Sequence, residues 1–350
     1  MATFKIGKRT LGEGHPCFII AEAGINHNGD LKIAKKMVDV AAKAGADAIK
    51  FQTFKAEEVV NTQEEMIAYR HQGKLVKESF MGLLRSVELA YKEWRELAAY
   101  AKAKDILFFS TPQNMPDLRM LMKIGVPAIK VGSDDLTCLP QLAEYAKTRL
   151  PMIVSTGMAY LSEVDEAVRT ILPHNPKLAV LHCVSLYPAE FEELNLRRIE
   201  TLKSAYPNVV VGFSDHSRGI TAPLVAVALG AKVLEKHFTL DRGMKGPDHG
   251  FALESDELRQ LVREVRNAEA SLGSSVVEPV GERELKERKE SQRSLVAVKD
   301  ITKGEKITKE NVAPRRPGTG LPPKFLLYLL GKKATRDIKA HEFIRLESIQ

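Results

Sequence analysis

The sequence has few cysteines, few aromatic residues and no long apolar run. Its three cysteines, Cys17, Cys138 and Cys183, form no CxxC pair among 350 residues, so we expect neither a disulfide framework nor a zinc ribbon. The opening residues lack an apolar signal core, and no window holds the roughly 18 uninterrupted apolar residues of a membrane-spanning helix. We therefore expect a cytoplasmic protein without a membrane partner.

Basic residues are in modest excess over acidic ones, which gives the chain a net charge of +7. This excess permits nucleic acid, an anionic surface or an acidic small molecule as a partner. The Lys and Arg residues are spread along the chain, and no RNP, zinc-finger or basic-zipper pattern accompanies them. We interpret the charge as a solvated basic surface and expect no nucleic-acid partner, with a non-enzymatic polymer binder as an alternative.

Short apolar runs alternate with helical stretches from Cys17 to about Leu272. This alternation is typical of an α/β fold in which helices cover parallel strands. The eight runs are CFIIAEA, DAIKFQT, ILFFST, PAIKVGS, PMIVST, LAVLHCV, VVVGFSD and KVLEKHF. Because eight parallel strands close a barrel, we predict a (β/α)8 TIM barrel over residues 1–272, with FKIGKRTLG as a hairpin at its bottom.

Two segments depart from the alternation. A long insertion follows the second strand, from about Lys55 to Tyr91, and insertions of this length are more often lids or binding loops than filler. Residues 273–293 are charged and indicate a linker. Residues 294–350 then predict a small module of short strands and turns, a size at which a domain tends to dock on something else.

Polar residues end nearly every predicted strand. In a barrel of parallel strands these ends converge on one face, where active sites form, so the joint pattern favours a functional site. The residues are Glu22, Asn26 and His27, Lys50 and Gln52, Ser110 and Thr111, Lys130 and Ser133, Ser155 and Thr156, His182 and Tyr187, Asp215 and His216, and Glu235 and His237.

Lys50 and Lys130 occur in matching AIK contexts on the second and fourth strands. Two converging ammonium groups would bind a phosphorylated or carboxylated substrate, and the hydroxyls of the nearby STP and STG steps suit phosphate. Two alternatives stay open. Each lysine could neutralise a buried carboxylate such as Glu22 or Asp135, or one could form a Schiff base as in a class I aldolase.

His216 and His237 end the seventh and eighth strands, which are neighbours in a closed barrel. Their imidazoles can therefore meet at one divalent metal, with an acid such as Glu22 and open positions for Lewis-acid chemistry. We expect manganese, with magnesium, cobalt or zinc as alternatives. Asp248 in the GPDH loop could bind sugar hydroxyls or stabilise its turn, and Arg316 in RRPGTG could project outward from a rigid turn.

A series of motifs resembles, in order and spacing, the sialic acid synthase family. The motifs are AEAGINHNGD, AIKFQT, FFSTP, AIKVGSDD, IVSTGM, LHCVSLYP, GFSDHS, ALGAKVLEKHFT and GPDH, and RRPGTG with LLGKKATRDI resembles the family's C-terminal SAF, or antifreeze-like, domain. The resemblance covers nearly the whole chain. It implies a metal-dependent condensation of phosphoenolpyruvate with N-acetylmannosamine or a related N-acyl hexose, giving N-acetylneuraminate and phosphate. Legionaminic or pseudaminic acid synthesis from a diacetamido-dideoxy hexose is the alternative.

The same resemblance implies roles for single residues and an assembly. Glu22 matches the family's catalytic glutamate, and we expect Lys50 and Lys130 to act with it. For phosphoenolpyruvate binding we expect Lys50, Thr111, Lys130, Ser133, Ser155, Ser185 and Tyr187. For sugar binding we expect Gln52, Asp135, Asp248 and Arg316. Ser185 stands where some relatives carry Asn, and Asp135 where some carry Glu. The implied assembly is a domain-swapped homodimer, in which Arg316 reaches the barrel mouth of the other chain.

Overall fold

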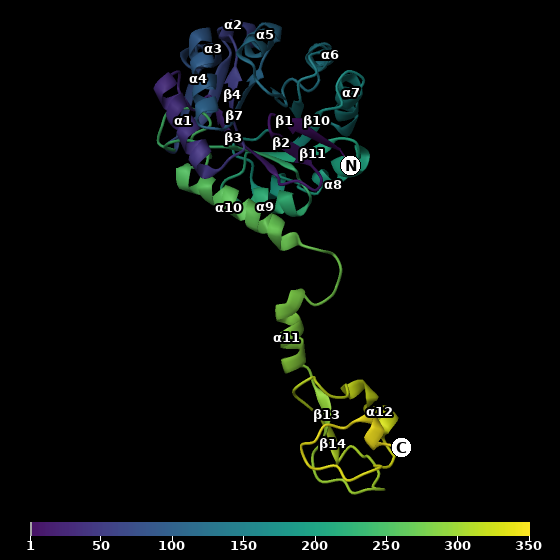
Figure 1. The fold of residues 1–350 in the computed structure, drawn as a ribbon. Coiled ribbons are helices and arrows are strands. Elements are labelled where there is room, and N and C mark those ends of the chain that lie inside the picture. Colours follow the sequence, from purple (N-terminus) through teal and green to yellow (C-terminus); the bar gives the residue numbers. More distant parts are fainter. Residues whose placement is uncertain (1) are drawn as a thin grey trace. The chain divides into compact units, whose positions relative to one another are not determined.

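The computed structural model describes residues 2–350, which form two compact units that divide between Gly273 and Ser274. In the first unit, eight parallel strands lie inside a ring of helices (Figure 1). The strands are β3 (Phe18–Gly24), β4 (Ala48–Thr53), β7 (Leu107–Pro112), β8 (Ile129–Val131), β9 (Met152–Ser155), β10 (Leu178–Cys183), β11 (Val210–Asp215) and β12 (Val233–His237). Each corresponds to one of the eight predicted runs.

The strands close into a barrel. They are hydrogen-bonded in the order β7-β4-β3-β12-β11-β10-β9-β8, and every neighbouring pair is parallel. The two strands at the ends of this order, β7 and β8, lie against each other. The predicted (β/α)8 TIM barrel is therefore confirmed, and all eight strands bring their carboxyl ends to the same face.

Helices cover the outside of the barrel. They are α1 (Leu31–Ala44), α4 (Tyr91–Ala103), α5 (Met115–Ile124), α6 (Leu139–Lys147), α7 (Leu161–Ile171), α8 (Arg198–Ala205), α9 (Thr221–Ala228) and α10 (Ser255–Leu272). The sequence sets the ends of α1: the Asp30 carboxylate accepts a hydrogen bond from the Lys32 amide, and Gly45 ends the helix at φ 82°, where a side chain would be strained. Covered on both faces, every side chain of β3 is buried.

Two antiparallel hairpins are added to the barrel. β1 (Thr3–Ile6) and β2 (Arg9–Gly12) form the predicted N-terminal hairpin, and its Gly7 lies against the side chain of Leu107, the first residue of β7. The hairpin therefore sits at the amino-terminal ends of the strands. The long insertion after β4 holds α2 (Ala56–Val59), a second hairpin of β5 (Met66–His71) and β6 (Lys74–Ser79), and α3 (Phe80–Ser86).

The second unit has its own small apolar core. Its regular elements are α11 (Gly281–Ser291), β13 (Ser294–Ala297), β14 (Val312–Arg315) and α12 (Leu326–Leu329). The core residues are Leu295, Ala297, Ile301, Ile307, Val312, Leu329, Ala334, Ile338 and Ile344. The segment 273–293, predicted as a linker, contains the exposed helix α11, and from Ser274 onward it groups with this unit. The domain limits themselves stay a prediction.

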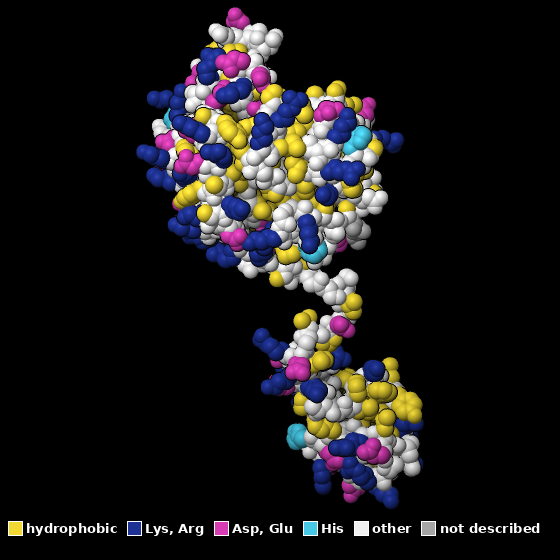
Figure 2. Space-filling model, turned by 45° about the horizontal axis from the view of Figure 1, so that its top comes forward, with side chains coloured by type: hydrophobic (Ala, Val, Ile, Leu, Met, Phe, Trp, Pro, Cys, Tyr) yellow, Lys and Arg dark blue, Asp and Glu magenta, His cyan; other side chains and the backbone are white. Residues whose placement is uncertain are grey.

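The surface carries its charge in a dispersed form. Figure 2 shows Lys and Arg side chains scattered over the visible face of the first unit rather than gathered in one patch. Among residues 2–350, no helix is long and apolar enough to cross a membrane.

Candidate active site

A cavity of about 460 Å³ opens at the carboxyl ends of the barrel strands. Its polar lining comes from strand ends and from the loops that follow them. These residues are Glu22, Lys50, Gln52, Thr111, Gln113, Lys130, Ser133, Asp134, Ser155, Ser185, Tyr187, Ser214, His216, Glu235, His237 and Asp248. The barrel therefore gathers charged, hydroxyl and imidazole groups from all eight of its strands or their loops into one volume.

The residues to which a binding, catalytic or metal role was assigned lie in this cavity, with two exceptions, Asp135 and Arg316. Six other strand-end residues do not line it: Asn26, His27, Ser110, Thr156, His182 and Asp215. Asp134 lines it rather than Asp135, whose buried Oδ2 has no hydrogen-bond partner within residues 2–350. Burial raises the pKa of Asp135 to about 7. Arg316 belongs to the second unit, where it is exposed just after β14. The individual roles expected of all these residues stay predictions.

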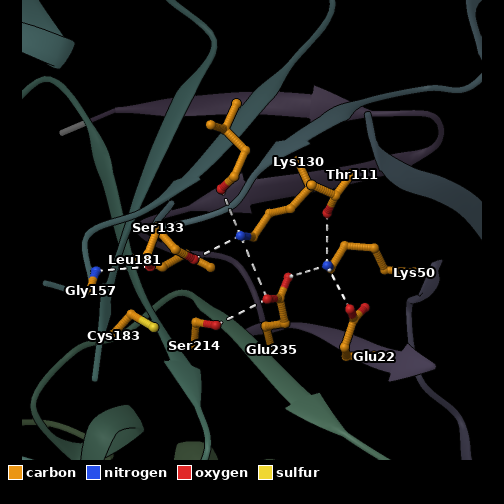
Figure 3. A network of polar contacts seen from close by, with 12 residues as sticks. Glu22, Lys50, Thr111, Lys130, Ser133, Gly157, Leu181, Cys183, Ser214 and Glu235 are labelled. Atoms are coloured by element: carbon orange, nitrogen blue, oxygen red, sulfur yellow. Dashed lines mark hydrogen bonds and ion pairs between the residues drawn. The ribbon is translucent and has the colours of Figure 1, made fainter. Parts of the chain in front are cut away.

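Lys50 is buried between two carboxylates (Figure 3). Its Nζ donates to Glu22 Oε1 at 2.8 Å and to Thr111 Oγ1 at 3.0 Å, and it lies 3.7 Å from Glu235 Oε2. Burial alone lowers the pKa of Lys50, but Glu22 and Glu235 outweigh burial and raise it, so the ammonium group is charged. Burial raises the pKa of Glu22 to about 7 despite Lys50, which suits a group that exchanges protons at neutral pH.

Lys130 approaches the same carboxylate from the other side. Its Nζ donates to Ser155 Oγ at 2.7 Å and to the Val131 carbonyl at 2.8 Å, and it lies 3.6 Å from Glu235 Oε1. Burial lowers the pKa of Lys130. Burial would raise the pKa of Glu235, but Lys130 and Lys50 outweigh burial and lower it. Glu235 is therefore an ionised bridge between the two lysines (Figure 3).

The alternative in which each lysine neutralises a buried carboxylate holds in part. Lys50 pairs with Glu22 as that alternative states, whereas Lys130 lies beside Glu235 and not Asp135. Sequence reasoning placed Glu235 among the strand-end residues but gave it no role. The sequence could have indicated a role for Glu235, because Glu235 and His237 are two residues apart in β12 and therefore point to the same face of the strand.

Hydroxyl groups and a glycine form a small cradle near Lys130. The Gly157 amide donates to Ser133 Oγ at 2.9 Å, and a Cβ added at Gly157 would lie 2.2 Å from Ser185 Oγ. Only glycine leaves this space open. The buried Ser185 hydroxyl has no hydrogen-bond partner within the described chain. Hydroxyls and a turn amide next to a buried ammonium group are the donors that suit a phosphate or carboxylate.

His216 and His237 lie side by side, with ring centroids 5.3 Å apart. His216 Nδ1 is 2.7 Å from the Val184 carbonyl oxygen, which can only accept, so this nitrogen carries the proton and Nε2 is free to bind a metal. The buried Nδ1 of His237 has no hydrogen-bond partner in the described chain, and Asp248 Oδ2 lies 3.7 Å from it. Burial and His216 hold the pKa of His237 well below its usual range, so this ring is neutral.

The two imidazoles fit a divalent ion as a pair of ligands, which leaves its other positions open. Glu22 accepts a hydrogen bond from Lys50 through Oε1, while its buried Oε2 has no hydrogen-bond partner in the described chain, and its part in a metal site stays a prediction. Within residues 2–350, no three His, Cys, Asp or Glu side chains form a metal-binding cluster. The Tyr187 ring packs on His216 with centroids 4.1 Å apart, which holds the imidazole in the cavity wall.

Comparison with known proteins identifies the family. The model of the NeuB family matches residues 37–277, and that of the SAF domain matches residues 292–350. The chain belongs to the NeuB family. Its sequence is 41% identical over 330 residues to the N,N'-diacetyllegionaminic acid synthase of Campylobacter jejuni, covering 93% of this chain and 98% of the relative. It is 36% identical to the human N-acetylneuraminate-9-phosphate synthase, covering 97% and 95%.

A solved NeuB-family structure has the same fold. The crystal structure of N-acetylneuraminic acid synthetase from Leptospira borgpetersenii, in complex with citrate, matches with a TM-score of 0.74 at 39% identity, over 81% of this chain and 94% of that one. The resemblance to sialic acid synthases stated from the motifs is confirmed, including the C-terminal SAF domain. As a member of this family of carbon–carbon bond-forming synthases, the chain is an enzyme.

Proposed function

We propose that this enzyme condenses phosphoenolpyruvate with an N-acyl hexose and releases phosphate. The sugar is N-acetylmannosamine, giving N-acetylneuraminate, or a diacetamido-dideoxy hexose, giving legionaminic or pseudaminic acid. The observation that carries the proposal is the convergence of Lys50, Lys130 and the cradle at Gly157 in one cavity with His216 and His237. The related synthases of N-acetylneuraminate phosphate and of diacetyllegionaminate support it.

Phosphoenolpyruvate carries a phosphate and a carboxylate, and the base of the cavity offers donors for both. Lys50 and Lys130 supply two ammonium groups, and hydroxyl donors surround them. Those hydroxyls belong to Thr111, Ser133, Ser155 and Ser185. Glu235 compensates part of the positive charge of Lys50 and Lys130. A bound phosphoenolpyruvate would add further negative charge beside the two ammonium groups.

The sugar aldehyde needs activation because carbon 3 of an enol phosphate is a weak nucleophile. His216 and His237 would hold a divalent ion, manganese in our proposal, which when bound polarises that aldehyde. Tyr187 packs on the His216 ring, and the cavity would hold the two reactants within attack distance of each other. Gln52, Asp248 and the partner's Arg316 would contact the sugar.

One proton relay accounts for the protons gained and lost in this reaction. Carbon 3 attacks the aldehyde carbon and forms the new carbon–carbon bond, while the aldehyde oxygen gains a proton. Water adds to the cation at carbon 2 and loses a proton, and the resulting intermediate expels phosphate by cleavage of its carbon–oxygen bond. Glu22, with its pKa of about 7, can carry a proton between these steps.

Phosphate release from phosphoenolpyruvate tests the proposal. The full chain is assayed with N-acetylmannosamine, its 6-phosphate and diacetamido-dideoxy hexoses, before and after chelation. We expect sugar-dependent phosphate release that chelation abolishes and a divalent ion restores. Lys130→Met should lower kcat/KM for phosphoenolpyruvate by about 100-fold, the effect of losing a charge-assisted contact.

Lys147→Met is the matched control, because Lys147 is an exposed lysine on α6 that forms an ion pair with the exposed Glu144. It should leave the kinetics unchanged. Trapping of Lys50 or Lys130 by borohydride, with full activity after chelation, would establish the aldolase alternative instead. Tight polymer binding at physiological salt with phosphate release at background would establish the binder alternative.

A further inference from the structure

One side of the cavity takes no part in the chemistry proposed above. It is lined by apolar side chains from the loop after β3, the end of β4 and the insertion that follows it. We call these residues the apolar wall: Ile25, Phe54, Val59, Ile67, Ala68, Tyr69, Phe80, Leu83 and Leu84. Tyr69 alone among them has a polar group on its side chain.

The apolar wall is backed by its own core. Ile25, Phe54 and Leu84 are buried in a cluster separate from the barrel core, together with Ala56, Val60, Met81 and Val87, and Phe80 packs against this cluster. Because strand side chains alternate, Ile67 and Tyr69 of β5 point to the same face of the hairpin. The wall is therefore formed before any ligand binds.

The hairpin is also fixed at its far side. Tyr69 donates its hydroxyl to Glu78 Oε1 at 2.6 Å, so the ring and not the hydroxyl is available to the cavity. Lys245 Nζ donates to Glu78 Oε2 at 2.9 Å, and Gln72 Nε2 donates to the Gly243 carbonyl at 3.3 Å. These contacts join the hairpin to the loop after β12, the loop that carries Asp248.

The wall offers nothing to a charged or hydroxylated group. Of the described residues that line the cavity, the Lys and Arg residues are Lys50 and Lys130, and both are engaged with carboxylates at its base. A phosphate against the wall would have no cation in this unit. A hydroxyl against it would lose water without gaining a partner, whereas a methyl group would be stabilised by burial.

We infer that the apolar wall is a specificity subsite for the deoxygenated, methyl-bearing end of the acceptor sugar. The inference rests on the proposed function and narrows it to one substrate class: a 6-deoxy diacetamido hexose, in preference to N-acetylmannosamine and to any 6-phosphorylated hexose. Apolar pockets discriminate against an added hydroxyl by at most about 100-fold, so the preference over the matching 6-hydroxy sugar is about 10- to 100-fold in kcat/KM.

The test compares sugars that differ by one oxygen. With the metal-loaded full chain and saturating phosphoenolpyruvate, kcat/KM is measured for 2,4-diacetamido-2,4,6-trideoxymannose and for its 6-hydroxy counterpart, and then for N-acetylmannosamine and its 6-phosphate. The inference expects the 6-deoxy sugar to be preferred. Equal values, or a preference for the hydroxylated or phosphorylated sugar, overturn it. Absence of phosphate release with every sugar overturns the proposed function as well.

A pair of hairpin variants locates the preference. Ile67→Thr keeps the branch at Cβ but shortens the side chain and adds a hydroxyl to the wall, so it should reduce the 6-deoxy preference at least 5-fold through KM for the sugar, with KM for phosphoenolpyruvate unchanged. Leu75→Thr makes a similar change on β6, where Leu75 is 61% exposed and does not line the cavity, and should leave the preference intact. Equal effects of both variants, or an Ile67→Thr enzyme with unaltered preference, overturn the assignment.

Discussion

Four buried charges share the base of the cavity, and each depends on the others. Glu22 and Glu235 lie between or beside Lys50 and Lys130, at distances of 2.8 to 3.7 Å. An ion buried without its partner costs several kcal/mol, so removing one of the four disturbs the remaining three. Substitutions at these residues therefore mix folding with function. Gly157 offers a cleaner probe of the same site, because it carries no charge.

Gly157→Ala should weaken phosphoenolpyruvate binding. The added Cβ would lie 2.2 Å from Ser185 Oγ and 2.8 Å from Ser133 Oγ, so the hydroxyls of the cradle must move apart. We expect KM for phosphoenolpyruvate to rise about 10-fold, equivalent to about 1.4 kcal/mol, with little change in KM for the sugar. Steady-state kinetics measure both constants.

Gly250→Ala serves as the control, since the nearest heavy atom to its Cβ would be 3.9 Å away. It should leave KM for phosphoenolpyruvate as it is. If Gly157→Ala left that constant unchanged too, the cradle would not be the anion site.

Sequence reasoning located the residues of the cavity better than their pairings. Strand-end residues such as Lys50 and His237 could be predicted because the ends of buried strands are visible in the apolar pattern. The choice between Asp134 and Asp135 could not be predicted. Both residues follow the short strand β8 in a turn, where no periodicity indicates which side chain faces the cavity. The contacts of Glu235 with both Lys50 and Lys130 could not be predicted either, because they depend on the distances between different strands of the barrel.

At the scale of elements, the barrel strands were the most predictable part of the chain. Burial on both faces gives continuous apolar runs, and glycines such as Gly45 and Gly125 mark the helix ends before them. The insertion after β4 was recognised only as a loop. Its hairpin could not be predicted because MIAYRH and KLVKES are short, mostly exposed strands with weak alternation.

The ends of β11 and β12 are joined by a buried ion pair. Lys236 Nζ donates to Asp215 Oδ2 at 2.6 Å, and these residues precede His216 and His237 in the chain. Lys236→Met would leave the Asp215 carboxylate buried without a cation, so we expect a loss of about 3–5 kcal/mol in the free energy of unfolding. Urea titration of the full chain measures this change.

The double variant Asp215→Asn with Lys236→Met removes both charges and should recover part of that loss. A single variant within about 0.5 kcal/mol of the parent protein, the range of ordinary surface substitutions, would contradict the role given to the pair.

At the scale of the whole molecule, the chain combines a barrel that contains the cavity with a second unit that has its own core. The sequence predicted a small module of short strands and turns over residues 294–350. Helix α11 was not predicted, because the sequence GERELKERKES has no apolar face. None of its side chains is buried, and ion pairs such as Lys286 with Glu290 lie along its surface.

The predicted domain swap has a direct test by complementation. Arg316→Ala should raise KM for the sugar without changing metal content, and Lys130→Met should lower kcat/KM about 100-fold in the barrel in which it lies. Co-expressed as a mixed dimer, the two variants should regain activity, because the intact barrel of one chain receives Arg316 from the other. Tagging each chain differently isolates the mixed species for assay. A mixed dimer no more active than the two variants alone would show that Arg316 does not act across chains.

The N-terminal hairpin has a consequence for the order of events in catalysis. It covers the amino-terminal end of the barrel, with Phe4, Ile6 and Leu11 buried in the main core. Solutes then enter and leave past the opposite rim, where the β5–β6 hairpin meets the Asp248 loop. A ligand bound at Lys130 lies deeper in the cavity than one bound near that rim, so the deeper ligand must enter first. Phosphoenolpyruvate should therefore bind first and the sugar second, and the phosphate formed beneath the new sugar acid should depart last.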